Sequence, residues 1–212
     1  MNLSARNKLL SIPTVNTYTY LILACWISFI AYWAFSASRA KKSIRGPSFR
    51  RSMYVRLALF VTVILVLHFA GDRYWLWHGD TAQRDDFAYG FFSSTLVRSI
   101  GVALCVFGIA LAIRARTVIG RNWGMPMSLK VNPELVTSGP YGHIRHPIYT
   151  GVLAAMLGSA LALGAVLFIP FLFLSTYFIY SAMKEEATMT RQFPDAYAEY
   201  RHRTSMLIPF VL

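Results

Sequence analysis

Residues 135–151 read LVTSGPYGHIRHPIYTG and set a polar, cationic turn directly against a long apolar run. No charged residue occurs from Ile148 to Met183, and an acidic pair, Glu185 and Glu186, stands at the far end. A continuous helix from Ile148 to Met183 would be roughly 54 Å long, whereas the hydrocarbon core of a bilayer is about 30 Å thick. The chain must therefore fold back on itself within this run.

The break in the apolar run belongs at residues 163–170. Gly164 lies near the middle of the run, and Pro170 is acceptable in the first turn of a new helix. The sequence therefore predicts a helical hairpin. Such a hairpin brings the cationic turn before the run to the same membrane face as the acidic pair after it.

Composition identifies the chain as an integral membrane protein. Hydrophobic residues make up 56% and charged residues only 14%, which is too apolar for an ordinary soluble domain. The net charge of +12 would suggest nucleic acid on a soluble domain, but here the basic residues lie in loops between apolar runs. We interpret them as determinants of membrane topology and as contacts for anionic lipid headgroups, and we expect no nucleic-acid partner. Cys25 and Cys105 lie inside apolar segments and indicate neither a disulfide nor a metal site.

The hydropathy pattern predicts an all-α integral membrane fold with about five transmembrane helices. Three spans, at residues 18–35, 53–71 and 96–113, precede the two of the hairpin. A cleaved signal peptide is the competing interpretation of the first span, although its apolar core would be longer than usual. We treat residues 1–212 as one membrane domain, in which residues 1–113 form a scaffold and residues 114–212 the functional core.

Loop charges orient these spans. The first loop carries six basic residues between Arg39 and Arg51, whereas the second mixes Arg73 and Arg84 with four aspartates. Because basic loops stay inside, the amino terminus is predicted outside and the carboxyl terminus in the cytoplasm. We expect a multi-pass protein of the bacterial inner membrane whose active site faces the cytoplasm. Aromatic residues at 74–77 and 91–92 would then form a belt at the outer interface.

The cationic turn is a candidate anion site. Pro147 suits the first position of the fourth helix, so the free amides of that helix would lie beside Arg145 and His146. The alternative is that both residues merely mark the cytoplasmic end of a span. Glu185 and Glu186, at or near the carboxyl end of the fifth helix, are disfavoured by its dipole and call for compensation. Alternatively, Lys184 compensates them at the surface, or the helix runs on through Thr190. A ligand carrying an amino-acid zwitterion and a ribose would use both charged pairs at once.

A metal site is another explanation of the histidines in the turn. His143 and His146 are spaced as a short pair, and two glutamates would lie nearby. Membrane di-iron enzymes need far more histidine ligands than this chain offers, and a single short pair is weak support for zinc. We therefore expect no metal.

At these residues the chain resembles the isoprenylcysteine carboxyl methyltransferase and phospholipid methyltransferase family of small membrane enzymes. The resemblance covers nearly half of the chain, from about Leu111 to Leu212, and depends on several motifs in the right order. They are Ile119–Trp123, Leu135–Tyr141, Arg145–Gly151, Glu185–Glu186, Phe193, Tyr197, Tyr200 and Ile208–Pro209. Two positions depart from the pattern: Gly142 stands where many relatives carry arginine, and Pro194 replaces a common glycine.

The resemblance implies that this region folds over S-adenosylmethionine, with the Arg-His-Pro turn and the acidic pair lining the pocket. The expected cofactor-binding residues are Trp123, Tyr141, His143, Arg145, His146, Tyr149, Gly151, Glu185 and Glu186. The expected catalytic residues are Arg145, His146 and Arg201. The acceptor would be a lipophilic small molecule or a lipid in the bilayer.

The chemistry of the residues is compatible with this assignment. The glycine-rich nucleotide turn of soluble enzymes is absent from the sequence, so the cofactor would be held by another route. Methyl transfer from a sulfonium needs alignment and exclusion of water, and no metal. A lipid carboxylate acceptor would suit Arg201 or Arg203, whereas a phospholipid amine would need a base such as His146. Both arginines could equally contact lipid phosphates.

Two other functions stay open from the sequence. Membrane sterol reductases, which use NADPH, have a similar carboxyl-terminal architecture, but their comparable turn reads Arg-His-x-Asn-Tyr, whereas this chain has Pro147 and Ile148. A non-catalytic membrane scaffold is the other alternative.

Overall fold

The computed structural model describes residues 17–37, 43–45, 91–92, 94–123, 129–130 and 134–208. Its α-helices are α2 (Thr17–Ala37), α5 (Thr95–Ile119), α6 (Pro147–Leu163), α7 (Phe168–Gln192) and α8 (Pro194–His202). Within these ranges the connecting segments include the short 3-10 helices η2 (Gly120–Asn122), η3 (Gly139–Gly142) and η4 (Ala165–Leu167). Two short strands, β1 (Ser43–Arg45) and β2 (Leu129–Lys130), pair antiparallel.

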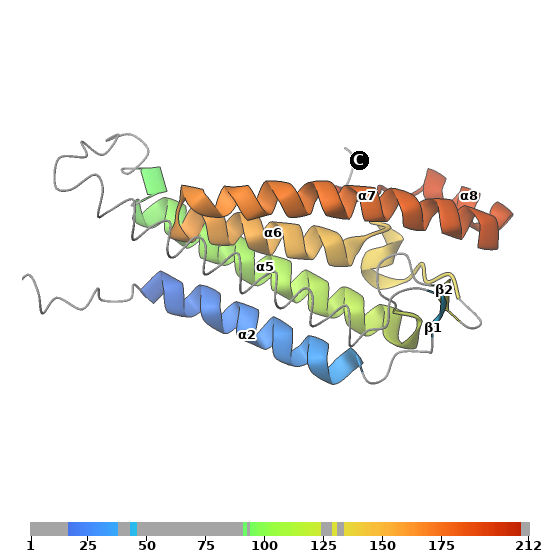
Figure 1. Ribbon diagram of the computed structural model, residues 1–212, viewed down its shortest axis with the longest axis horizontal. Coiled ribbons are helices and arrows are strands. Elements are labelled where there is room, and N and C mark those ends of the chain that lie inside the picture. Colours follow the sequence, from blue (N-terminus) through green and yellow to red (C-terminus); the bar gives the residue numbers. More distant parts are fainter. Residues whose placement is uncertain are drawn as a thin grey trace, which may run out of the picture.

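In the described part of the chain, the long helices α2, α5, α6 and α7 lie side by side along the long axis of the molecule (Figure 1). Helices α2 and α5 run in the same direction: Arg98 lies over the ring of Tyr18 near one end, and Tyr32 hydrogen-bonds Thr117 over 2.6 Å near the other. Helix α6 runs antiparallel to α5, and α7 runs antiparallel to α6. The predicted second span at residues 53–71, which would connect α2 to α5, lies outside the described residues.

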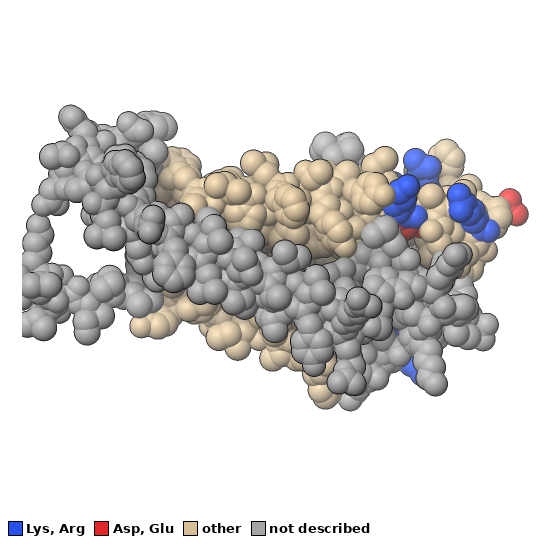
Figure 2. Space-filling model, viewed as in Figure 1, with Lys and Arg blue, Asp and Glu red and all other residues tan. Residues whose placement is uncertain are grey.

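The predicted helical membrane fold is confirmed in outline. Within the described ranges, three helical segments are long and apolar enough to cross a bilayer: Thr17–Ser36, Thr95–Asn122 and Ala165–Gln192. Helix α6 is apolar but has only 17 residues, which is roughly 26 Å of helix. In Figure 2 the visible Lys, Arg, Asp and Glu side chains lie toward the end where α7 meets α8, and the described surface seen along the rest of the bundle shows none.

The hairpin breaks where the sequence predicts. Helix α6 ends at Leu163, and Gly164 follows with φ 134°, a conformation that side-chain-bearing residues rarely adopt. One turn of η4 then leads into α7, with Pro170 in its first turn. A proline there costs no hydrogen bond, because the first amides of a helix have no intrahelical partner.

Two helices run further than the apolar pattern indicates. Helix α5 continues past 113 to Ile119, and α7 continues past 183 to Gln192. Glu185 and Glu186 therefore lie near the carboxyl end of α7, as expected, but before its final turn. The helix ends at Gln192, because Phe193 precedes Pro194 and the residue before a proline is disfavoured in the helical region.

Helices α5 and α6 pack so closely that their backbones touch through glycine. A Cβ placed on Gly151 would lie 2.6 Å from the carbonyl oxygen of Gly108, and one on Gly101 would lie 2.6 Å from that of Gly158. Small residues fill the space between these pairs, with Cys105 and Ala155 fully buried. Such contacts replace the hydrophobic effect as the source of helix association in lipid.

Candidate functional site

The site lies at the end of the bundle where three segments meet: the turn at residues 143–146, the last turns of α7, and the chain that follows α8. Pro147 is the first residue of α6, as predicted, and His146 caps it. The turn pairs with the carboxyl-terminal residues through a parallel bridge between Ile144 and Ser205. Thr150 in the first turn of α6 donates a hydrogen bond of 2.6 Å to the carbonyl of Leu207.

The charged residues of the turn and of α7 converge, as the hairpin predicts. Nε of Arg145 donates a hydrogen bond of 2.6 Å to Oε1 of Glu186. Nδ1 of His146 lies 3.6 Å from Glu185, and its Nε2 lies 3.6 Å from Glu186. Arg201 reaches in from α8, with Nε 3.7 Å from Glu186. We call Arg145, His146, Glu185 and Glu186 the charged cluster.

His146 favours the charged form in this setting. Burial by itself lowers the pKa of His146, but the facing carboxylates of Glu185 and Glu186 outweigh it, and the net effect is a raised pKa. Neither contact is a full hydrogen bond, since 3.6 Å is too long for one. Nε2 of His146 is buried and has no hydrogen-bond partner within the described part of the chain.

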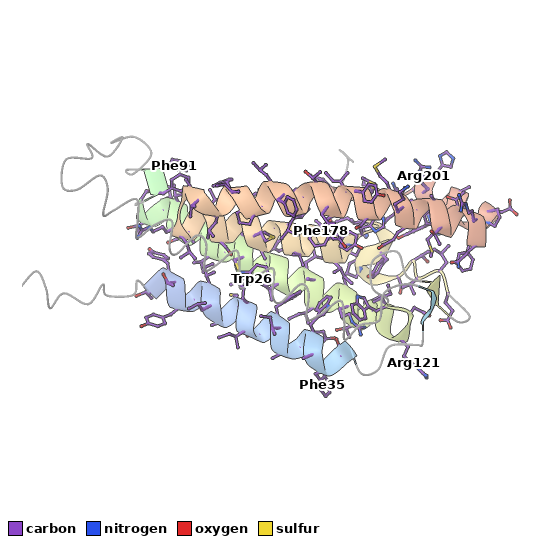
Figure 3. The ribbon with its side chains drawn as sticks, in the orientation of Figure 1. Trp26, Phe35, Phe91, Arg121, Phe178 and Arg201 are labelled. Carbon is purple, nitrogen blue, oxygen red and sulfur yellow. The ribbon has the colours of Figure 1, made fainter. Side chains whose placement is uncertain are left out.

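A stack of three flat rings runs from the charged cluster toward the apolar body of the bundle. The ring of His146 lies parallel to that of Tyr149, with centroids 5.5 Å apart. Tyr149 in turn stacks on Phe178 of α7 at 4.7 Å. The phenol of Tyr149 donates a hydrogen bond of 2.6 Å to Oε1 of Glu185. Figure 3 shows Phe178 on the side of α7 that faces α6.

Three buried tyrosines pack beside the cluster. Tyr141, Tyr197 and Tyr200 are each almost completely buried. Burial raises the pKa of Tyr200 to about 12 and also raises the pKa values of Tyr141 and Tyr197. All three are neutral phenols at physiological pH, and Tyr200 donates a hydrogen bond of 2.7 Å to the carbonyl of Tyr141.

Some predicted site residues lie elsewhere or at the margin. Trp123 packs against Trp33, and the guanidinium carbon of Arg116 lies over the Trp123 ring, 4.6 Å from its centroid. Gly151 lies in the contact between α5 and α6. His143 is exposed and does not join the charged cluster.

Arg201 is the predicted site residue at the edge of the site. Its side chain is 62% exposed, although it reaches Glu186. In Figure 3 it lies at the same end of the bundle as Arg121, opposite to Phe91.

The structure adds residues that sequence reasoning missed. Phe178 and Ser181 share a face of α7 with Glu185, at spacings of seven and four residues, and helical periodicity would have indicated them. Oγ of Ser181 is buried without a hydrogen-bond partner within the described ranges. Arg116, 2% exposed, donates to the carbonyls of Ser36 and Gly120, which no sequence pattern signals.

A resident metal gains no support from the side chains. Among the described residues, no group of three or more His, Cys, Asp and Glu side chains is arranged to hold a metal ion. The histidine pair of the turn is also separated, since His146 faces two carboxylates while His143 is exposed.

Comparison with known proteins identifies relatives. Residues 96–196 match the family described as phospholipid methyltransferase. The chain is 33% identical over 129 residues to the cobalt-zinc-cadmium resistance protein CzcN of Cupriavidus metallidurans, covering 58% of this chain and 56% of that protein. It is 31% identical over 131 residues to the protein-S-isoprenylcysteine O-methyltransferase of Schizosaccharomyces pombe, covering 59% and 54%. The nickel-cobalt-cadmium resistance protein NccN of Alcaligenes xylosoxydans xylosoxydans is 31% identical over 113 residues, covering 52% of each. The chain spans about half the length of the curated relatives it matches.

Proposed function

Because the chain belongs to the phospholipid methyltransferase family, we propose that it is a membrane-embedded enzyme that transfers the methyl group of S-adenosylmethionine to a lipophilic acceptor. The resemblance inferred from the motifs is confirmed by the comparisons. The observation that carries the proposal is the charged cluster, which sets two carboxylates against an arginine and a histidine at one end of an apolar bundle.

The residues of the cluster fit this cofactor chemically. An amino-acid zwitterion needs both acceptors and donors, and a ribose needs acceptors for its hydroxyls. Glu185 keeps 27% of its side chain exposed, so a ligand can reach its carboxylate. Nε2 of His146 is a buried polar atom that lacks a partner within the described residues, and a bound ligand would satisfy it. We propose that Glu185, Glu186, His146 and Tyr149 hold the cofactor.

The chain's own contribution to the reaction is alignment and the exclusion of water. The bound sulfonium supplies an already activated methyl group. The stack of His146, Tyr149 and Phe178 offers flat aromatic faces that suit a sulfonium and an adenine. The stack also extends from the charged cluster toward the apolar body of the bundle, where its rings would help to exclude water. Holding donor and acceptor in line can lower the barrier by about 7 to 11 kcal/mol.

Two classes of acceptor fit the site. A lipid carboxylate would lie near Arg201, which is exposed and reaches the edge of the cluster. A phospholipid amine would need a base, and a glutamate of the cluster, or His146 in its unprotonated form, would remove its proton. Mass analysis of products formed from prenylcysteine and from phosphatidylethanolamine separates the two. We propose that the site faces the cytoplasm of a multi-pass inner-membrane protein, with five spans in all.

Metal resistance is a second candidate function, because two relatives are named for resistance to cobalt, zinc, cadmium or nickel. It is tested by expressing the chain in a metal-sensitive host and measuring growth on cobalt, zinc and cadmium salts. Tolerance that survives Glu185→Gln would make metal resistance independent of the proposed pocket. Loss of tolerance in Glu185→Gln would show that metal resistance depends on the proposed pocket.

Calorimetry of the purified chain in mild detergent tests the proposed function. We expect S-adenosylhomocysteine to bind without metal and a chelator to leave the affinity unchanged. Mass spectrometry of the nucleotide that co-purifies with the protein is the companion measurement. Binding of NADPH with no heat from S-adenosylhomocysteine would replace the methyltransferase by a reductase. If neither S-adenosylhomocysteine nor NADPH bound, a non-catalytic scaffold would be the remaining function.

A further inference from the structure

The guanidinium of Arg145 is already engaged by protein groups. Its Nε donates to Oε1 of Glu186 over 2.6 Å, and the two side chains are each only 9% exposed. Its Nη1 donates to the carbonyl oxygens of Thr204 and Arg201, the latter over 3.2 Å. One side chain therefore joins α7 to the chain that follows α8.

The backbone of the turn binds the same part of the chain. The amide of Arg145 donates to the carbonyl of Ser205 over 2.8 Å, and the amide of His146 donates to that of Met206 over 3.1 Å. We call residues 203–207 the C-terminal segment. The turn that holds two members of the charged cluster is thus built against this segment.

From these contacts we infer that Arg145 is a positioning residue, which holds Glu186 and docks the C-terminal segment onto the site, rather than a ligand of the cofactor carboxylate. To bind a carboxylate through Nε or Nη1, the side chain would have to give up a buried charge-assisted hydrogen bond. Leaving Glu186 without its partner inside the bundle would add to that cost. The effect on the cofactor is transmitted through Glu186 and His146.

A lysine cannot take over this role. The guanidinium directs separate N–H groups at a carboxylate and at backbone carbonyls in a fixed plane, whereas an ammonium is a single point charge. Arg145→Lys therefore keeps the charge beside Glu186 but loses the carbonyl contacts. Arg191→Lys on the exposed end of α7 is the matched control.

The experiment compares two ligands and rests on the proposed function for the choice of probe. S-adenosylhomocysteine carries the carboxylate, and S-adenosyl-3-thiopropylamine is the same molecule without it. For Arg145→Lys we expect affinity for both ligands to fall by the same factor, roughly ten- to hundredfold. A loss confined to S-adenosylhomocysteine would overturn the inference, because it would show direct contact with the carboxylate.

Hydrogen exchange measures the docking without any ligand. In Arg145→Lys we expect faster exchange of the amides at 203–207, with α5 unchanged and with no effect in Arg191→Lys. Unchanged exchange in the C-terminal segment would overturn the inference. If the parent binds no S-adenosylhomocysteine, the proposed function fails, and the exchange result alone decides the role of Arg145.

A second variant covers the case in which Arg145→Lys does not fold. Ser205→Pro removes the amide that donates 3.1 Å to the carbonyl of His143, and it leaves the guanidinium untouched. If Arg145 acts through the C-terminal segment, Ser205→Pro should also lower the affinity for both ligands. Parental affinity in Ser205→Pro, with the exchange of residues 203–207 accelerated, would overturn the inference.

Discussion

The phenol of Tyr149 lies 2.6 Å from Oε1 of Glu185 and donates a hydrogen bond to it, which joins the first turn of α6 to the last turns of α7. These two residues are 36 positions apart, and the hairpin alone brings them together. The bond orients one carboxylate oxygen of Glu185, while the other oxygen faces His146 at 3.6 Å. Glu185 is consequently ordered but still partly open to a ligand.

Replacing Glu185 by glutamine should therefore weaken cofactor binding. Losing one charged hydrogen bond costs about 1.5 to 3 kcal/mol, which is roughly a ten- to hundredfold loss of affinity in calorimetry. Glu199→Gln is the matched control, because Glu199 is 77% exposed and pairs only with Arg203 among the described residues. Equal affinities in the parent and in Glu185→Gln would mean that the acidic pair is merely a solvated part of the helix.

Replacing Phe178 by leucine should weaken cofactor binding more modestly. A stacked aromatic pair contributes about 0.5 to 1.5 kcal/mol beyond the area it buries, so we expect roughly a two- to tenfold loss. Phe173→Leu, on the outer face of the same helix and 75% exposed, should bind like the parent. If both variants behaved alike in the binding assay, the ring stack would have no part in the site.

The stability of the protein should depend on pH through His146. Its folded-state pKa lies above the ordinary value of 6.5, so the protonated ring stabilises the fold fully below about pH 6.5. This contribution is lost as the pH rises through the folded-state pKa. We expect the thermal midpoint of the parent, relative to that of His146→Gln, to decline over this range. Parallel midpoint curves for the two proteins would contradict the prediction, and His202→Gln, at an exposed position of α8, serves as the control.

Replacing Gly151 by alanine should reduce stability rather than act on a ligand. The added Cβ would meet the backbone of Gly108 at 2.6 Å, and such overpacking costs about 1 to 3 kcal/mol. Gly142→Ala is the control, since its Cβ would meet the carbonyl of Thr137 at an ordinary 3.4 Å. Unfolding in detergent measures both variants. A Gly151→Ala protein of parental stability that had lost cofactor affinity would restore the ligand role first predicted for this glycine.

Cysteine labelling of intact cells tests the predicted orientation. Arg45→Cys, at the end of the bundle that holds the charged cluster, should be protected from an impermeant reagent. Asp85→Cys, which lies outside the described residues, should react. The reverse pattern would place the proposed site on the outer face of the membrane.

The sequence by itself determined the hairpin and the meeting of its charged ends. An apolar run longer than a bilayer is thick must turn, and Gly164 marks where the backbone can do so. From there, helix geometry carries the acidic pair back to Arg145 and His146. These are properties of length, hydropathy and local backbone preference, which the chain shows without its fold.

Only the tertiary structure decided what each of these side chains touches. The main partners of Arg145 and Arg116 include backbone carbonyls, at Thr204 and Ser36 among others, and every residue has a carbonyl, so no sequence pattern reveals which one a guanidinium will reach. Gly151 likewise reads as part of a ligand motif until α5 is seen to approach it within a few ångströms. Such contacts depend on how helices pack, and packing is set by the shapes of surfaces far apart in the chain.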